Sequence, residues 1–203
     1  MNTRFVGDSA LLMDTQDAWA AQQLCLAIHK QSLRGVRELV PAYNSLLLEF
    51  DPLDFDVTNF FRLLPKFMQA KKTPVTAREY DIAVTYDGED LREVARITGL
   101  DIDEVIHRHE SAIYTVAFLG FAPGFPYLTG LDPKLQVPRM KSPRTKVPAG
   151  AVAIADEFSG IYPQATPGGW RILGHTDTVL FDPARASPAL LAPGDNVHFR
   201  PVA

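Results

Sequence analysis

The sequence predicts an α+β protein built from two unlike halves, and three observations support this prediction. The chain has 203 residues, 46% of them hydrophobic, which is enough for one large core or two small ones. Helix-like and strand-like apolar patterns alternate in its first half. In its second half lie twelve of the 16 prolines, from Pro123 onward, and nine of the 13 glycines, from Gly120 onward. Such composition is typical of short strands joined by stiff loops.

The first half predicts strands and helices in an order typical of a ferredoxin-like domain. A strand is expected within 4–13, and the next helix, which Asp14 or Thr15 can cap, carries an apolar face of Ala21, Leu24, Cys25 and Ile28. The remaining elements expected are strands at 36–40 and 45–50, a helix at 57–64 capped by Asp56 and ending or kinking near Pro65, and an alternating strand at 80–86. This order is the βαββαβ pattern, which by itself names no function.

Two capping boxes, at 90–93 and 101–104, predict two short helices, the first ending at Gly99. In the second helix His109 shares the apolar face, so we expect a packed, hydrogen-bonded histidine, with a role in a site as the alternative. His107 points elsewhere. Two residues apart on a helix, the two histidines cannot chelate one metal, so no metal site is expected.

The second half predicts a barrel-like or sandwich β domain with long loops. Its expected strands lie at 114–121, 151–155, 171–173, 178–181 and 196–199. We therefore divide the chain into domains at 1–78 and 79–203.

Composition excludes several classes of protein. The net charge of −4 argues against nucleic-acid binding, because phosphates attract a basic surface. A single cysteine, Cys25, excludes an internal disulfide and a metal site of paired cysteines, so we expect a cytoplasmic protein with Cys25 in the core. No apolar run reaches the roughly 18 residues of a membrane helix, and the start at Met1 lacks a signal-peptide pattern, so no membrane partner is expected.

A basic stretch is the most concentrated candidate for chemistry, since nucleotide-binding, metalloprotease and serine-hydrolase motifs are absent from the sequence. No acid occurs from Pro133 through Ala155, a stretch that contains Lys134, Arg139, Lys141, Arg144 and Lys146. Arginines on proline-stiffened loops can hold a carboxylate or phosphate, so Arg139, Arg144 and Lys146 are candidate anion ligands. The alternative is a solvated loop or a docking face for an acidic partner.

Two further segments carry unusual residues. In 166–176, Gly168 and Gly169 allow close approach of a ligand, Trp170 can stack on a flat substrate, and His175 and Thr176 can handle protons or hydrogen bonds. The alternative is a tight turn with Trp170 in the core. In 120–130, aromatic residues among prolines suit a pocket or a partner interface, or else a core loop; the candidate interface residues are Phe121, Pro123, Gly124, Phe125 and Tyr127.

Motifs along nearly the whole chain resemble one family, the small subunit of bacterial ATP-dependent 5-oxoprolinase, which also includes the kinase inhibitor KipI and allophanate hydrolase subunit 1. The motifs that resemble it, in order, include Gly7-Asp8-Ser9-Ala10, Val40-Pro41-Ala42-Tyr43, Gly120-Phe121-Ala122-Pro123-Gly124-Phe125, Val147-Pro148-Ala149-Gly150, Gly160-Ile161-Tyr162-Pro163 and Pro167-Gly168-Gly169-Trp170. The resemblance implies a ferredoxin-like domain followed by a cyclophilin-like β-barrel. It also implies a larger carboxyltransferase-like barrel subunit (PxpC or KipA type) and a lactam-utilisation subunit (PxpA type) as partners.

The resemblance further implies an activity: opening of 5-oxo-L-proline to L-glutamate with ATP, with or without Mg²⁺, bound by the assembled complex rather than held intrinsically. Phosphorylation of the lactam oxygen would create a leaving group, and Arg139, Arg144 and Lys146 would supply positive charge. The alternatives are inhibition of a sensor histidine kinase and carboxyl transfer to urea. The chain departs from the family pattern at Met140, Ala151, 156–159 and His175, which weakens the anion site and leaves the substrate open.

Overall fold

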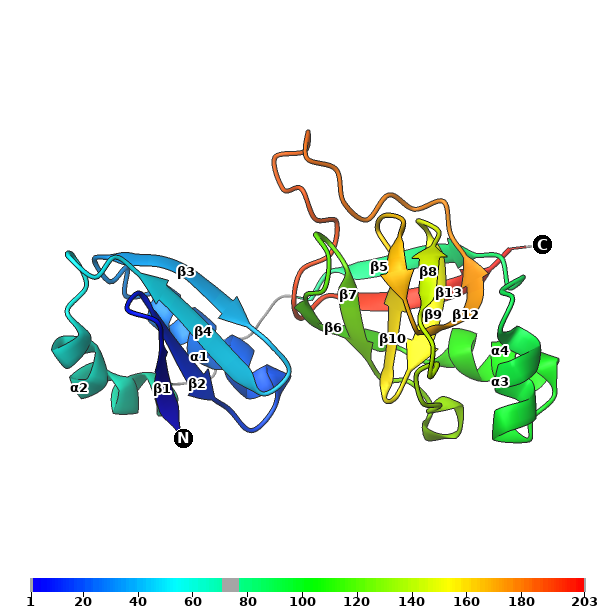
Figure 1. The fold of residues 1–203 in the computed structure, drawn as a ribbon, viewed down its shortest axis with the longest axis horizontal. Coiled ribbons are helices and arrows are strands. Elements are labelled where there is room, and N and C mark those ends of the chain that lie inside the picture. The colour runs from blue at the N-terminus through cyan, green and yellow to red at the C-terminus, as the bar shows by residue number, and fades with distance from the viewer. Residues whose placement is uncertain (1, 71–76, 203) are drawn as a thin grey trace. The chain divides into compact units, whose positions relative to one another are not determined.

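The computed structural model describes residues 2–70 and 77–202, and the chain divides into two compact units, 1–75 and 76–203. Each unit has its own hydrophobic core. Figure 1 shows mixed helices and strands in both units, so the α+β class is confirmed.

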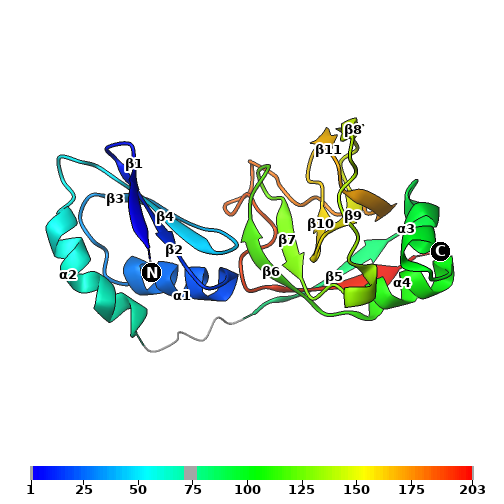
Figure 2. The same ribbon diagram turned by 60° about the horizontal axis from the view of Figure 1, so that its bottom comes forward.

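The first unit is a four-stranded antiparallel sheet with two helices. Its strands are β1 (Thr3–Val6), β2 (Ala10–Asp14), β3 (Val36–Pro41) and β4 (Ser45–Phe50), in the order β1-β2-β4-β3. Its helices are α1 (Ala18–His29) and α2 (Val57–Met68), which lie on one face of the sheet (Figure 2). The strand expected within 4–13 is confirmed as β2, and the residues before it form a further strand, because Gly7, with a φ of +64°, reverses the chain between β1 and β2.

Local signals predict the helices well, with two corrections. Asp56 caps α2 as predicted, but α1 is capped by Asp17, whose carboxylate accepts from the Ala20 amide over 2.7 Å, and not by Asp14 or Thr15. Pro65 lies inside α2 and does not end it, since the helix continues to Met68. Cys25 is half-buried and packs against the core of this unit, and burial raises the pKa of its thiol.

The second unit is a seven-stranded, nearly closed sheet that holds two helices against it. Its strands follow the order β12-β9-β10-β7-β6-β13-β5. The bounds are β5 (Glu79–Val84), β6 (Tyr114–Leu119), β7 (Pro126–Thr129), β9 (Ala151–Ala155), β10 (Phe158–Ile161), β12 (Arg171–His175) and β13 (Asn196–Pro201). The helices α3 (Leu91–Thr98) and α4 (Ile102–Ser111) contact β12 and β13 respectively, and a single 3₁₀ turn, η1, covers Pro133–Leu135.

The strand predicted at 80–86 exists as β5, but its assignment to a ferredoxin-like βαββαβ domain is wrong. It pairs in parallel with β13, with Glu79 opposite Asn196 and Val84 opposite Pro201. The first unit is therefore ββαββα. Alternation correctly identified Ile82 and Val84 as the buried face of the strand, but a single buried face does not specify which sheet covers it.

The seven-stranded sheet is brought to near closure by a bridge between its two ends. Thr85, directly after β5, and His175, the last residue of β12, exchange two backbone hydrogen bonds of 2.9 Å each. Gly174 makes this approach feasible, because a Cβ there would collide with the Thr85 carbonyl oxygen. The predicted strand at 178–181 is wrong: Phe181 forms only an isolated bridge to Ala189, although Leu180 is buried in the core.

A small two-stranded sheet stands against the outside of this barrel. It pairs β8 (Arg144–Val147) with β11 (Thr166–Gly168), and Figure 2 shows the two strands side by side. Residues of β9 alternate between two cores: Val152 and Ile154 point into the barrel, and the alanines at 151, 153 and 155 point outward. The small alanine side chains leave room for an aromatic cluster on the outer face.

Candidate functional site

A cavity of about 130 Å³ lies over this aromatic cluster, where the three segments singled out in the sequence meet. The aromatic segment, the basic stretch and the Gly-Gly-Trp turn each contribute residues, together with Tyr162 after β10. Its lining residues are Phe121, Phe125, Tyr127, Arg139, Met140, Pro143, Tyr162, Gly168, Gly169 and Trp170. The structure thus brings most of the predicted binding residues together.

The floor of the cavity is a rigid set of aromatic rings. Phe125 packs edge-on against Tyr162 and Trp170, with ring centroids 5.1 and 5.3 Å apart. Gly160 permits this packing, because a Cβ there would lie 2.9 Å from the Trp170 ring and 3.0 Å from the Phe125 ring. Gly168 is equally constrained, since a Cβ would collide with the Tyr162 hydroxyl group. Both sequence alternatives for Trp170 therefore hold: it is a core residue and it lines the cavity.

Phe121 stands at the cavity in a strained turn. Its φ is +68°, and the Ala122 amide donates to the Gly120 carbonyl oxygen over 2.8 Å, which closes a γ-turn around it. The Phe121 side chain nevertheless remains 61% exposed. A bulky residue in this backbone conformation is disfavoured, and such strain occurs preferentially at functional sites.

The candidate interface residues separate into exposed and buried ones. Phe121 and Pro123 are exposed, whereas Gly124 and Phe125 are buried and Tyr127 is half-buried. Phe125 and Gly124 support the loop from below, where a Cβ on Gly124 would lie 2.8 Å from Phe181 Cβ. A partner can therefore reach the side chains of Phe121 and Pro123, and that of Tyr127 in part, whereas Gly124 and Phe125 are buried.

Arg139 is the cation of the basic stretch that lines the cavity. The Met140 amide donates to the Gly169 carbonyl oxygen over 2.8 Å and so ties the basic stretch to the Gly-Gly-Trp turn. The Arg139 guanidinium lies 5.9 Å from the centroid of the Trp170 ring, and its Nε donates to Asp156 Oδ2 over 3.3 Å. The site thus carries one positive group above an aromatic floor.

Arg144 and Lys146 do not line the cavity. The Arg144 side chain is 18% exposed and contacts two carboxylates, Asp90 at 2.6 Å and Glu89 at 2.7 Å. Two acids on one guanidinium neutralise it, so Arg144 links the β8 region to the start of α3 and offers no free charge to an anion. Lys146 is exposed on β8.

His175 and Thr176 lie away from the cavity. β12 runs from Arg171 to His175, which separates His175 from Trp170 by about 16 Å of extended strand. His175 Nδ1 lies 2.8 Å from Asp87 Oδ1 at the barrel seam, and both side chains are exposed. The hydroxyl group of Thr176 donates to Thr178 Oγ1 over 3.1 Å.

His109 is fully buried, and the expectation of a packed, hydrogen-bonded histidine is confirmed. Its Nδ1 lies 2.8 Å from the Tyr86 hydroxyl group, its Nε2 lies 2.9 Å from Ser159 Oγ, and its ring stacks on Phe199 with a centroid distance of 4.6 Å. Burial lowers the pKa of His109 to about 3, so the ring is neutral at physiological pH. Both nitrogens are used inside the core.

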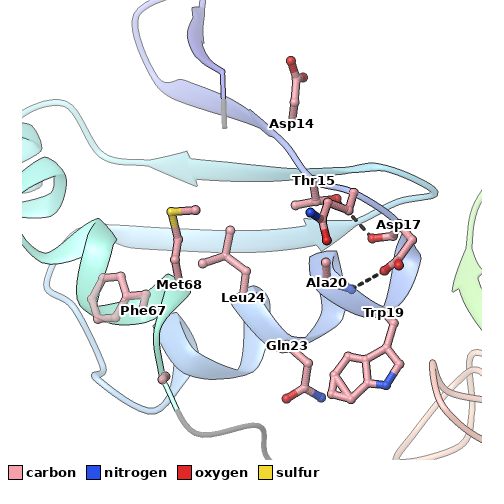
Figure 3. Close-up of a pocket in the computed structure, with 11 residues that line it drawn as sticks. Asp14, Thr15, Asp17, Trp19, Ala20, Gln23, Leu24, Phe67 and Met68 are labelled. Atoms are coloured by element: carbon pink, nitrogen blue, oxygen red, sulfur yellow. Dashed lines mark hydrogen bonds between the residues drawn. The ribbon is translucent and has the colours of Figure 1, made fainter.

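A second cavity, of about 670 Å³, belongs to the first unit (Figure 3). Trp19 and Gln23 from α1, and Phe67 and Met68 from α2, border it together with the segment that follows β2. Its two carboxylates have structural partners, since Asp14 pairs with Arg4 at 3.1 Å and Asp17 caps α1. This cavity therefore offers no charged group dedicated to a ligand.

Sequence reasoning missed Asp156, Tyr162, Met140 and Pro143 as site residues. Asp156 had a detectable signal, because it is the first acid after the acid-free stretch from Pro133 to Ala155. Tyr162 occurs in the Gly160-Ile161-Tyr162-Pro163 motif, but nothing in that motif distinguishes a tyrosine at a site from one in a core. Among the described residues, no group of three or more histidine, cysteine or acidic residues could hold a metal ion. Within the same ranges, no helix is both long enough and apolar enough to span a bilayer.

Comparisons with known proteins are consistent over nearly the whole chain. A family model described as "Carboxyltransferase domain, subdomain C and D" matches residues 1–191. A 5-oxoprolinase subunit from Escherichia coli O157:H7 is 38% identical over 97% of this chain and 94% of its own length. The corresponding 5-oxoprolinase subunit from Bacillus subtilis is 36% identical over 96% and 90%, respectively. The urea amidolyase of Saccharomyces cerevisiae is 25% identical over 98% of this chain and 13% of its own length.

Solved structures show the same fold. TTHA0988 superposes with a TM-score of 0.85 at 38% identity, over 100% of this chain and 40% of its own chain, so this chain spans less than half of that protein. PH0987 from Pyrococcus horikoshii is also 38% identical, covers 99% of this chain and 97% of its own, and has a TM-score of 0.60.

Proposed function

Because the chain belongs to the family of carboxyltransferase domains, subdomain C and D, we propose that it is a subunit of an ATP-dependent 5-oxoprolinase, which converts 5-oxo-L-proline to L-glutamate. The observation that carries this proposal is the cavity itself. Three separate segments converge to place one guanidinium over an aromatic floor, an arrangement that suits a small, flat, polar ring.

The size of the cavity supports a small substrate. Sites that enclose drug-sized ligands occupy about 300–1,000 Å³, whereas this cavity measures about 130 Å³. A cavity of about 130 Å³ is large enough for a five-membered lactam but too small for a nucleotide. The aromatic rings exclude water from one face of the ligand and strengthen its hydrogen bonds.

The residues of this chain do not fit a triphosphate. Of the three cations predicted to bind phosphate, only Arg139 lines the cavity, while Arg144 is neutralised and Lys146 lies outside. We therefore assign nucleotide binding to the assembled complex, and we derive no step of the reaction through ATP on this chain. The chain contributes one wall of the site and recognises the lactam.

The site is incomplete in this chain, which supports a requirement for partner subunits. The cavity supplies binding groups, but neither His175 nor Thr176 lies beside it to transfer a proton. We propose that a larger carboxyltransferase-like barrel subunit covers the cavity next to Phe121, and that a lactam-utilisation subunit completes the complex. The exposed and strained Phe121 side chain supports this choice of surface.

Reconstitution tests the proposal. The chain is mixed with the two partner subunits from the same genome, and release of ADP and glutamate from ATP and 5-oxo-L-proline is measured. We expect turnover only in the complete mixture, with no activity from this chain alone. A complete mixture that releases neither product contradicts the proposal. Carboxylation of urea with a biotin carboxylase partner, or inhibition of a sensor histidine kinase by the isolated chain, would then identify the alternative function.

A further inference from the structure

The guanidinium group of Arg139 has an open edge. Only its Nε is engaged, through the 3.3 Å hydrogen bond to Asp156, and no hydrogen bond to either terminal nitrogen occurs within the described part of the chain. Guanidinium donors form a planar fork that matches two oxygens of one anion. With Nε occupied, the two terminal nitrogens remain available to bind such an anion from the cavity side.

Asp156 holds this fork in place. It begins the two-residue turn between β9 and β10 with a φ of +52°, a conformation that aspartate tolerates better than most residues. Its amide donates to the Val137 carbonyl oxygen over 2.8 Å, while its carboxylate accepts from Arg139. The turn is therefore hydrogen-bonded to the residues on both sides of Pro138, Val137 and Arg139. Asp156 is a positioning residue, because it acts on a ligand only through Arg139.

The surroundings of the fork restrict the anion it can take. A cavity of about 130 Å³ with a single available cation suits one singly charged oxyanion on a small ring. The Trp170 ring, 5.9 Å from the guanidinium carbon, lies where it can contact the apolar part of that ring. Phosphate groups of a nucleotide need several cations or a metal ion, and the second arginine is neutralised.

From this geometry we propose that Arg139, positioned by Asp156, clamps the carboxylate of the substrate, so that the site selects small cyclic amides that bear a carboxylate. This inference rests on the proposed 5-oxoprolinase function and names the group that this chain recognises. The lactam amide itself is left to face the partner subunit, where the chemistry takes place. Uncharged amides such as urea lack the group that the clamp binds.

Two probes separate the carboxylate from the amide. Cyclopentanecarboxylate keeps the ring and the carboxylate, and 2-pyrrolidinone keeps the ring and the amide. Each is tested as a competitive inhibitor of 5-oxo-L-proline turnover by the reconstituted complex. In Arg139→Gln we expect the KM for 5-oxo-L-proline and the inhibition constant of cyclopentanecarboxylate to rise roughly 10- to 100-fold, as for loss of a charged hydrogen-bond partner. The inhibition constant of 2-pyrrolidinone should not change.

Two more variants test the positioning role. Asp156→Asn preserves the turn and removes the charge, and it should raise the same two constants by only about 2- to 5-fold, as for an exposed ion pair. When Asp156→Asn is combined with Arg139→Gln, the two constants should be the same as in Arg139→Gln alone. Arg200→Gln is the matched control. Arg200 is 58% exposed and pairs with Asp81, much as Arg139 is 56% exposed and pairs with Asp156. Unlike Arg139, Arg200 lies outside the cavity.

Several outcomes would overturn the clamp. They are a lower kcat with unchanged KM in Arg139→Gln, an equal weakening of 2-pyrrolidinone inhibition, or no inhibition of the unmodified complex by cyclopentanecarboxylate. The first of these would assign Arg139 to charge developed during the reaction. Failure of the proposed function is a different result, since the unmodified complex would then not turn over 5-oxo-L-proline at all.

Discussion

Arg144 of β8 donates to Asp90, at the start of α3, over 2.6 Å in a part of the second unit where little water reaches either side chain. The other oxygen of Asp90 accepts from the Ile172 amide over 2.7 Å. One carboxylate thus joins three segments: the basic stretch, a helix start and β12. The capping-box pattern at 90–93 predicted a helix cap, but Asp90 makes no side-chain cap hydrogen bond and serves this tertiary contact instead.

The first prediction concerns this ion pair. Asp90→Ala leaves the buried Ile172 amide without its acceptor and removes one of the two carboxylates that contact Arg144, which keeps Glu89. We therefore expect a cost of about 2–3 kcal/mol of unfolding free energy, that of an unsatisfied buried donor together with a weakened ion pair. Urea denaturation of the full chain measures it. The control is Asp87→Ala, whose carboxylate is 59% exposed beside His175, with an expected cost below about 1 kcal/mol. Equal effects of the two substitutions would show that the Asp90 contacts do not stabilise the fold.

The second prediction is a pH dependence of stability from His109. The folded-state pKa is about 3, against about 6.5 for an unfolded histidine, so between these values the unfolded chain binds the extra proton. The stabilising contribution is complete above pH 6.5 and falls by about 1.4 kcal/mol per pH unit as the pH drops toward 3. The groups around the ring, Tyr86, Tyr114, Ser159 and Phe199, provide no negative charge to offset protonation at these pH values.

Denaturation at pH 7 and pH 5 tests this dependence. The unmodified chain should lose about 2 kcal/mol more between the two pH values than His109→Gln, which cannot titrate. Carboxylates elsewhere contribute equally to both proteins, so the difference isolates His109. A parallel loss of stability in the two proteins would mean that the ring is hydrated or already protonated at pH 5.

These residues show which parts of the fold can be predicted from sequence. Short-range signals worked: Asp56 and Asp101 cap their helices, Gly99 ends α3 with a φ of +73°, and the helical spacing placed His109 in the core. Pairing over long distances could not be predicted. Alternation identified β5 but could not reveal that its partner is β13, more than a hundred residues away.

Tertiary contacts explain two further misses. The strand β10 was not predicted, because Ser159 and Gly160 interrupt its apolar pattern; both are required by tertiary contacts, Ser159 with His109 and Gly160 with the Trp170 ring. The run 178–181 was predicted as a strand because it is apolar, yet it packs Leu180 in the core without a strand ladder. For the site, sequence identified the segments that converge, but not which arginine is neutralised.

The third prediction concerns the closure of the barrel at Thr85 and His175. Gly174→Ala introduces a Cβ against the Thr85 carbonyl oxygen and should disrupt the backbone hydrogen bonds at the seam. We expect a loss of at least about 2 kcal/mol in unfolding free energy, the cost of overpacking together with weakened hydrogen bonds. Gly120→Ala is the control, since a Cβ there meets only ordinary contacts at 3.5 Å or more. If both substitutions are equally tolerated, the seam is not closed in solution.

The fourth prediction separates strain from binding at Phe121. Phe121→Ala and Phe121→Gly both remove the ring, but glycine accepts a φ of +68° without penalty, so the glycine variant should be more stable than the alanine variant by about 1 kcal/mol. Both should bind the larger barrel subunit at least about 10-fold more weakly than the unmodified chain, as for an aromatic residue central to an interface.

The matched control for this binding measurement is Ile113→Ala. Ile113 is 62% exposed, close to the 61% of Phe121, but it does not line the cavity. Its substitution should leave the dissociation constant unchanged. Equal affinities for Ile113→Ala and Phe121→Ala would place the partner on another surface. A glycine variant no more stable than the alanine variant would show that the turn relaxes in solution, so that no strain is stored at Phe121.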